Sequence, residues 1–301
     1  MTISRRARVA RRSVGRTFDD SKTVEEQRAD MDRIDRLPRP RKVAYVDTTV
    51  GGVDAIVATP TREPPDRHVL YLHGGGYSVG SPKSHVAMGA RLAKRAAATV
   101  TLIDYRLAPE HPYPAAIDDC VAAYRALLAS TDPALVTVAG DSAGGGAALA
   151  TLCALRDAGD PLPGCSYLLS PWTDLTASGD SVRSKADVDP MIRADLITPM
   201  AEMYAADTPL DHPGVSPLFA DLTGLPPMLI QTGVDEVLLS DSTRLADRAR
   251  AAGVEVVLDL ADDMWHVYPM FAGLVPEATE ALVRAAVFIR ARTPAQAAVP
   301  G

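Results

Sequence analysis

The chain has 301 residues, of which 47% are hydrophobic and 23% charged. A chain of this length can bury roughly 75% of the surface of its unfolded state, so the composition excludes a mainly disordered protein. The net charge of −7 is unevenly spread, because residues 1–42 hold 13 of the 31 Lys and Arg but only 7 of the 38 Asp and Glu. The remaining chain is acidic, which argues against nucleic acid as the main partner.

The basic start of the chain lacks the features of a targeting segment. Arg5–Arg12 is not followed by the apolar run of about 7–15 residues that a signal peptide requires. No stretch approaches about 18 consecutive apolar residues, so we expect no membrane span. Cys120, Cys153 and Cys165 form no CxxC pair, which indicates neither a zinc site nor a disulfide framework. We therefore expect a cytoplasmic protein.

From residue 43 onward, short β-branched segments alternate with Ala-rich helical segments. The expected strands are 43–50, 53–59, 69–72, 99–103, 136–139, 165–169, 227–231 and 254–260. The expected helices are 84–97, 115–130, 143–157, 240–252 and 276–292. Strands separated by helices of about 10–15 residues predict an α/β fold with a mostly parallel central sheet and helices on both faces. We expect one domain over residues 1–301.

Two segments do not fit this alternation. Residues 1–42 are charged and helix-prone, and residues 174–217 are rich in Asp and Pro. An insertion that follows a sheet strand is a candidate lid.

The sequence Gly140-Asp141-Ser142-Ala143-Gly144 fits the pattern G-x-S-x-G and lies between an expected strand and an expected helix. A strand-to-helix turn of this kind holds a serine in strained geometry with its hydroxyl exposed above the sheet. Both glycines are needed, because a side chain would collide with the neighbouring strand and helix. The alternative is a glycine-rich turn with an ordinary serine.

A glycine tract, residues 73–76 (HGGG), directly follows the expected strand 69–72. Backbone N–H groups in such a tract can turn toward one point, and a tetrahedral oxyanion needs donors of this kind. We expect Gly74, Gly75 and Ala143 to supply them. A flexible loop is the alternative.

A serine becomes a good nucleophile only when a base takes its proton and a carboxylate orients that base. Among the six histidines, His266 alone follows the last strand and precedes the last helix. Asp235 follows the expected strand 227–231 and is the preferred carboxylate, with Glu236 and Asp241 as rivals. The order Ser142, Asp235, His266 is the order typical of this kind of triad. Each member follows a strand, where open α/β sheets place their sites.

With these residues the sequence resembles the α/β-hydrolases of the hormone-sensitive-lipase-like group, the bacterial family IV carboxylesterases. The resemblance covers about residues 40–292 and rests on five separated motifs in the family's order. They are HGGG at 73–76, YRLAPE at 105–110, GDSAGG at 140–145, SPWTDL at 170–175 and MWHVYPMF at 264–271. It implies Ser142 as nucleophile, His266 as base, Asp235 as its partner, and Gly74, Gly75 and Ala143 as oxyanion hole.

The resemblance also implies a helical cap, built here from about residues 1–42 and 176–215. YRLAPE would brace the site through Arg106 and Glu110. The family often dimerises through its last strand and helix, here residues 254–260 and 276–292, which makes a homodimer a candidate and leaves the oligomeric state open. Aromatic and Met side chains could line the pocket or belong to the core. They are Tyr77, Trp172, Met191, Met203, Tyr204 and Phe219.

We expect a serine esterase that hydrolyses short- to medium-chain carboxylic esters through an acyl-enzyme. The partner would be a small-molecule ester, with no metal and no organic cofactor. A lactone hydrolase or an N-acetyl hydrolase with the same triad is the alternative, because no motif separates them. A ligand-binding protein on the same fold, without catalysis, is a further alternative.

Overall fold

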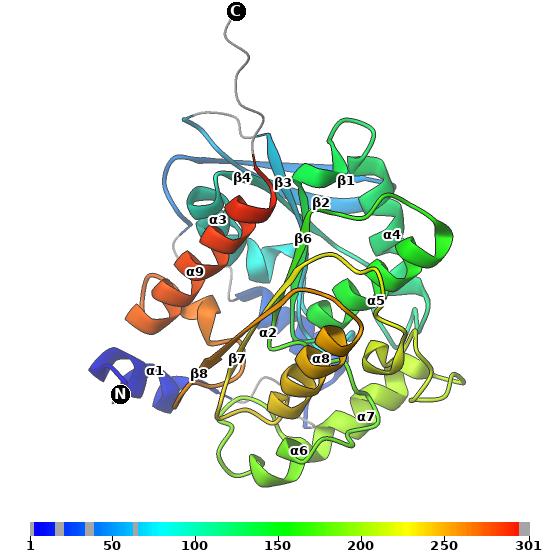
Figure 1. Cartoon of the computed structure of the whole chain (residues 1–301). Helices are drawn as coiled ribbons and strands as arrows, with labels where there is room; N and C mark the ends of the chain where they lie inside the picture. The colour runs from blue at the N-terminus through cyan, green and yellow to red at the C-terminus, as the bar shows by residue number, and fades with distance from the viewer. Residues whose placement is uncertain (1–2, 16–20, 34–38, 63–65, 295–301) are drawn as a thin grey trace, which may run out of the picture.

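The computed structural model describes residues 3–15, 21–33, 39–62 and 66–294. An eight-stranded sheet runs through the molecule in the order β1-β2-β4-β3-β5-β6-β7-β8 (Figure 1). The strands are β1 (Val43–Val50), β2 (Val53–Pro60), β3 (Arg67–Leu72), β4 (Ala98–Ile103), β5 (Val136–Asp141), β6 (Cys165–Leu169), β7 (Met228–Gly233) and β8 (Val256–Ala261). The pairs β1–β2 and β2–β4 are antiparallel, and the other five neighbouring pairs are parallel. The predicted α/β fold is therefore confirmed.

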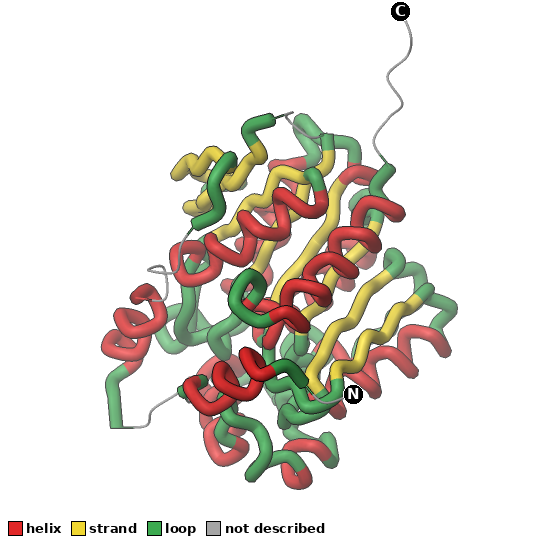
Figure 2. The backbone as a smooth tube through the Cα atoms, turned by 90° about the vertical axis from the view of Figure 1, so that its left-hand side faces the viewer, coloured by secondary structure: helices red, strands yellow, loops and turns green. Residues whose placement is uncertain are grey.

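Helices cover both faces of this sheet. The larger ones are α3 (Pro82–Ala96), α4 (Ala115–Leu127), α5 (Ala143–Ala158), α8 (Leu239–Ala251) and α9 (Pro276–Arg292). The helices α3 and α9 pack against each other on one face, whereas α4, α5 and α8 cover the other face (Figures 1 and 2). Each face buries an apolar core because the parallel strands between them carry side chains that are buried on both sides.

The predicted elements from residue 43 onward are all present, with ends shifted by at most three residues. The largest shift is at α4, which was expected to reach Ser130 and ends at Leu127. The chain turns there ahead of Pro133, whose ring suits the start of the short helix η2 (Pro133–Leu135). No helix among the described residues combines the length and the apolar character that a membrane crossing needs.

The two segments outside the alternation also contain helices. The first segment holds α1 (Arg5–Ser13) and α2 (Val24–Asp32), and the insertion holds α6 (Ser181–Ser184), α7 (Ala194–Ala205) and η3 (Pro217–Phe219). Helix α1 packs against α9, and α2 packs against α3. Figure 1 shows α6 and α7 together at one end of the molecule, beyond α8. These helices act as a cap only where they cover the site.

Candidate active site

Ser142 occupies the turn between β5 and α5, as predicted. Its backbone has φ 53° and ψ −123°, a conformation that strains any residue with a side chain. The two glycines around it have no room for a Cβ atom. At Gly140 it would lie 2.2 Å from the Gly144 carbonyl oxygen, and at Gly144 it would lie 2.1 Å from the Leu72 carbonyl oxygen. The expected reason for both glycines is thus confirmed.

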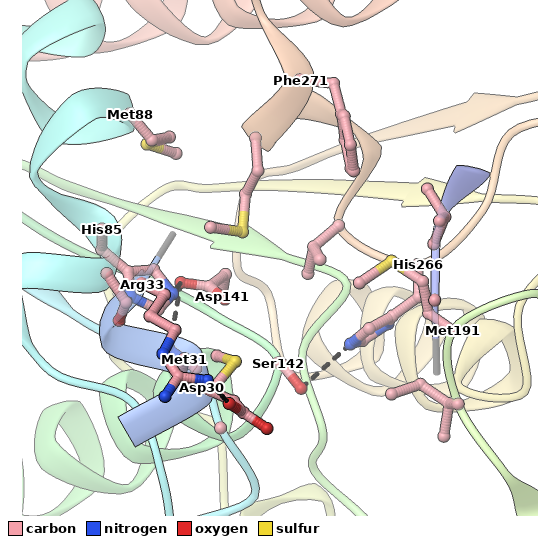
Figure 3. Close-up of a pocket in the computed structure, with 18 of the residues that line it drawn as sticks. Asp30, Met31, Arg33, His85, Met88, Asp141, Ser142, Met191, His266 and Phe271 are labelled. Carbon is pink, nitrogen blue, oxygen red and sulfur yellow. Dashed lines mark hydrogen bonds and ion pairs between the residues drawn. The ribbon is translucent and has the colours of Figure 1, made fainter. Parts of the chain in front are cut away.

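His266 reaches Ser142 from the loop after β8. Its Nε2 atom lies 3.0 Å from the Ser142 Oγ (Figure 3). The imidazole is 2% exposed, and His266 lies in the chain between the buried Trp265 and the short helix η4 (Tyr268–Phe271). The structure therefore brings the predicted nucleophile and the predicted base within hydrogen-bonding distance.

The other ring nitrogen of His266 faces Glu236 rather than Asp235. Nδ1 lies 3.4 Å from Glu236 Oε1, which is long for a hydrogen bond, and apo sites often show such lengthened contacts. The Glu236 carboxylate is fully buried, and its Oε2 accepts hydrogen bonds from the Ser170 hydroxyl at 2.8 Å and the Gly233 N–H at 3.0 Å. These two donors fix the carboxylate so that Oε1 points at the imidazole.

The expected pairing of Asp235 with His266 is wrong. The Asp235 carboxylate instead pairs with Arg11 at 2.9 Å and with Lys185 at 3.3 Å. Asp241, the other rival, is buried and accepts the N–H groups of Thr173 and Asp174. Glu236 is next to Asp235 in the chain, and side chains of consecutive residues in this turn point in different directions.

Two opposing effects set the basicity of His266. Burial lowers its pKa, but the hydrogen bond and the charge of Glu236 raise it, and the charges of Asp189 and Asp141 add to the increase. The balance leaves the pKa of His266 above the ordinary value of 6.5. Such an imidazole is a stronger proton acceptor than a free one.

Arg11 joins the first helix to both loops that carry His266 and its carboxylate. Besides its ion pair with Asp235, its guanidinium donates to the carbonyl oxygens of Asp263 at 2.7 Å and Val188 at 3.1 Å. Asp263 precedes His266 by three residues, and Val188 belongs to the insertion. Arg11, in the basic start of the chain, therefore connects helix α1 to the loops of Asp235 and Asp263 and to the insertion.

Replacing Arg11 by alanine is expected to lower the free energy of unfolding by about 1 kcal/mol, since the side chain is 24% exposed and solvent screens the ion pair. For a chain of this size that corresponds to a melting temperature lower by roughly 2–4 °C. Arg12→Ala removes an exposed arginine of the same helix and is the matched control. Equal melting temperatures of the two variants in a thermal-unfolding experiment would contradict the role given to Arg11.

The glycine tract supplies backbone donors, but they are not all the residues that we expected. The Gly74 N–H donates to the Asp141 carboxylate at 3.1 Å, so the expectation that it donates to an oxyanion is wrong. Within the described chain, the N–H groups of Gly75, Gly76 and Ala143 have no protein acceptor. Gly75 adopts φ 125°, and a Cβ atom there would lie 2.1 Å from the Val79 carbonyl oxygen. The turn that frees these donors therefore requires glycine.

Asp141 fixes the position of the glycine tract. The same Oδ1 that accepts from Gly74 also accepts from the Tyr71 hydroxyl at 2.8 Å and lies 3.3 Å from His85 Nε2. Burial raises the pKa of Asp141, but His85 and Tyr71 outweigh it and hold the pKa below its ordinary value. A buried, ionised carboxylate next to Ser142 thus ties the donors to the nucleophile turn.

The YRLAPE segment acts partly through other residues than expected. Tyr105 stacks on His73 with ring centroids 4.3 Å apart, and its hydroxyl donates to the His73 carbonyl oxygen at 2.6 Å. Glu110 pairs with Arg28 of α2 at 2.7 Å, whereas Arg106 pairs with Asp119 of α4. The segment therefore braces the glycine tract through Tyr105 and anchors α2 through Glu110.

A chamber of about 610 Å³ opens onto Ser142 and His266, and segments of both non-alternating regions line it (Figure 3). Its apolar side chains are Val14, Met31, Ala87, Met88, Met191, Ile192, Val267, Met270 and Phe271. Lys22, Asp30 and Arg33 add charge, and Asp30 is ion-paired with both cations. The described residues contain no group of His, Cys, Asp and Glu side chains suited to holding a metal ion.

Comparisons with known proteins agree with this geometry. A family model described as the alpha/beta hydrolase fold matches residues 69–270. An acetyl-hydrolase of Streptomyces hygroscopicus is 44% identical over 246 residues, which cover 81% of this chain and 82% of the relative. A carboxylesterase of Mycobacterium tuberculosis, NlhH, is 36% identical over 285 residues, which cover 89% of each protein.

Solved structures give the same result. An esterase from the bacterial hormone-sensitive lipase family superposes with a TM-score of 0.91 at 39% identity, over 97% of this chain and 100% of that one. A hormone-sensitive lipase from a metagenome library superposes with a TM-score of 0.93 at 41% identity, over the same shares of the two chains. The chain therefore belongs to the α/β-hydrolase family, and within it to the hormone-sensitive-lipase-like group whose motifs it carries.

Proposed function

We propose that this protein is a carboxylic ester hydrolase that works by two-step acyl transfer on Ser142. The single observation that carries the mechanism is the 3.0 Å contact between His266 Nε2 and the Ser142 Oγ in the strained turn. Esterases and a carboxylesterase among the relatives support the reaction class.

In the first step, the Ser142 hydroxyl donates its proton to His266 Nε2 while Oγ attacks the ester carbonyl carbon. Glu236 holds the imidazole in the required orientation and stabilises the imidazolium that forms. The N–H groups of Gly75, Gly76 and Ala143 would donate to the oxyanion. His266 then returns the proton to the leaving alcohol, and a water molecule hydrolyses the acyl-enzyme with His266 again as base.

Removal of an acetyl group from nitrogen is the second candidate, because the relative from Streptomyces hygroscopicus is named an acetyl-hydrolase, a name that does not specify an ester. The same serine, histidine and carboxylate would serve an N-acetyl amide or a lactone. A substrate panel that pairs an acetyl ester with the N-acetyl amide of the same leaving group separates these activities.

Covalent labelling tests the proposal directly. A fluorophosphonate probe should modify Ser142 with loss of fluoride, and peptide mass spectrometry should locate the adduct on that residue. Prior incubation with an ester substrate should slow the labelling. Absence of an adduct on Ser142 in the folded protein would overturn the proposal and favour a ligand-binding protein without catalysis.

Three expectations remain predictions. The cytoplasmic location is one of them. A cap from about residues 1–42 and 176–215 is supported by the side chains that both segments contribute to the chamber. A homodimer is supported by apolar side chains on the edge strand β8 and on α9. These are Val257, Leu260, Val283 and Val287, each between 42% and 51% exposed.

A further inference from the structure

Ser142 lies between two cavities of very different size. One is the chamber of about 610 Å³, and the other is a recess of about 20 Å³. The recess is lined by Gly76, Ser142, Trp172, Ile192, Arg193, Ile197, Met200 and Leu238. Ser142 and Ile192 are the only residues that line both, among those the structure describes.

The position of His266 decides which part of an ester each cavity receives. His266 lines the chamber and does not line the recess. The leaving oxygen must lie next to His266 Nε2, because that atom protonates it. The alcohol portion of the substrate therefore extends into the chamber. The acyl chain is bonded to the same carbonyl carbon and points away from the leaving oxygen, which directs it into the recess.

The recess is too small for more than a very short acyl chain. A cavity of about 10–15 Å³ holds one water molecule, so about 20 Å³ accommodates a methyl group and little else. Trp172, Ile197 and Leu238 form walls that are at most 4% exposed and belong to the main hydrophobic core. Closely packed walls of this kind do not yield without a cost in stability.

We propose that the preferred substrates are acetyl esters of bulky, mainly apolar alcohols. This inference rests on the proposed ester hydrolysis at Ser142 and adds the chemical class of both halves of the substrate. The chamber suits a bulky alcohol because methionine side chains line it, and their flexible thioethers adapt to irregular apolar shapes.

The positions of the other candidate lining residues fit the same division. Trp172 lines the recess and Met191 lines the chamber. Tyr77 and Tyr204 instead stack on each other with ring centroids 3.7 Å apart, inside the core. Met203 and Phe219 pack against that core and line neither cavity.

The first test uses the unmodified protein and p-nitrophenyl esters of acetate, butyrate and hexanoate. We expect kcat/KM to fall by about tenfold or more from acetate to butyrate and to fall again at hexanoate, since two extra methylenes find no space. Equal or higher kcat/KM with butyrate or hexanoate would overturn the acetyl preference. If that activity still depended on Ser142, the proposed ester hydrolysis itself would stand.

The second test widens the recess. Met200 lies on α7 and forms a half-buried part of the wall of the recess. Met200→Ala should therefore raise the ratio of kcat/KM for butyrate to kcat/KM for acetate by about tenfold. Met203→Ala removes the same side chain from the same helix outside the recess and should leave the ratio unchanged. Leu238→Val offers the same readout if Met200→Ala does not fold. An unchanged ratio in folded recess variants, or an equal change in Met203→Ala, would contradict the assignment.

The third test concerns the alcohol side. With the acetyl group kept constant, 1-naphthyl acetate should give a higher kcat/KM than p-nitrophenyl acetate, although p-nitrophenolate is the better leaving group. Met88→Ala alters the chamber wall and should change this ratio without changing the dependence on acyl length. If Met88→Ala altered the preference for acyl length instead, the assignment of the alcohol to the chamber and of the acyl chain to the recess would be overturned.

Discussion

Ser142→Ala is expected to lower kcat/KM for p-nitrophenyl acetate by a factor on the order of 10⁴ to 10⁶, because the atom that forms the acyl-enzyme is removed. Residual turnover should remain above that of water alone, since the backbone donors are untouched. Alanine carries the same Cβ atom as serine, so the strained turn and the melting temperature should change little. A steady-state assay with the melting temperature as control measures both.

Comparison with a second serine variant distinguishes the nucleophile from a serine that only supports the site. Ser170 is a buried serine near the site, where it donates to Glu236 and accepts from the Val267 N–H. Ser170→Ala should retain far more activity than Ser142→Ala, because it disturbs only the support of the carboxylate. If Ser142→Ala kept activity within tenfold of the unmodified protein, the nucleophile would have to be sought elsewhere.

Glu236→Gln is expected to lower kcat by a factor on the order of 10² to 10⁴, because a neutral amide neither fixes the imidazole tautomer nor stabilises the imidazolium. Asp235→Asn should lower kcat by less than about tenfold, since Asp235 is bound by Arg11 and Lys185 and does not contact His266. The two adjacent substitutions form a matched pair, each removing one negative charge from the same loop. A larger loss in Asp235→Asn than in Glu236→Gln would reverse the assignment.

The pH dependence of Glu236→Gln gives an independent readout. His266 must be neutral to accept the serine proton, so activity is lost as the pH falls through its pKa. Because Glu236 raises that pKa, the acid limb of kcat/KM in the unmodified protein should lie above pH 6.5. Removing the charge of Glu236 lowers the pKa, and the acid limb should move to lower pH. A limb that stays in place would mean that Glu236 does not act on His266.

The sequence was sufficient for the fold because each element carries its own signal. The local preferences of the chain agree with the global fold in the glycines of the nucleophile turn, the β-branched strands and the Ala-rich helices. This agreement is what allows a fold to be predicted from a sequence. Ser142 and His266 could be placed because Ser142 directly follows β5 and His266 lies in the loop after β8, and the carboxyl ends of parallel strands lie at one edge of the sheet.

The remaining parts of the site depend on where individual side chains and N–H groups point. Asp235 and Glu236 are adjacent carboxylates in one turn, and only the hydrogen bonds from Ser170 and Gly233 select Glu236. The sequence could not predict the role of Gly74 either, because its N–H donates to the buried Asp141 and is not free to donate to a substrate. The contacts of Glu236 with Ser170 and of Gly74 with Asp141 join residues more than 60 positions apart, and no local pattern encodes them.

The backbone conformation of Ser142 has a consequence for how this chain can evolve. At a φ of 53° and a ψ of −123°, glycine is the residue that the local backbone favours, and serine is held there by the surrounding packing. Substitutions that stabilise a natural protein are easy to find, but at a strained active site their recurrent cost is lost function. Selection for thermal tolerance and selection for turnover are therefore opposed at this one position, and any gain in robustness has to arise in other parts of the molecule.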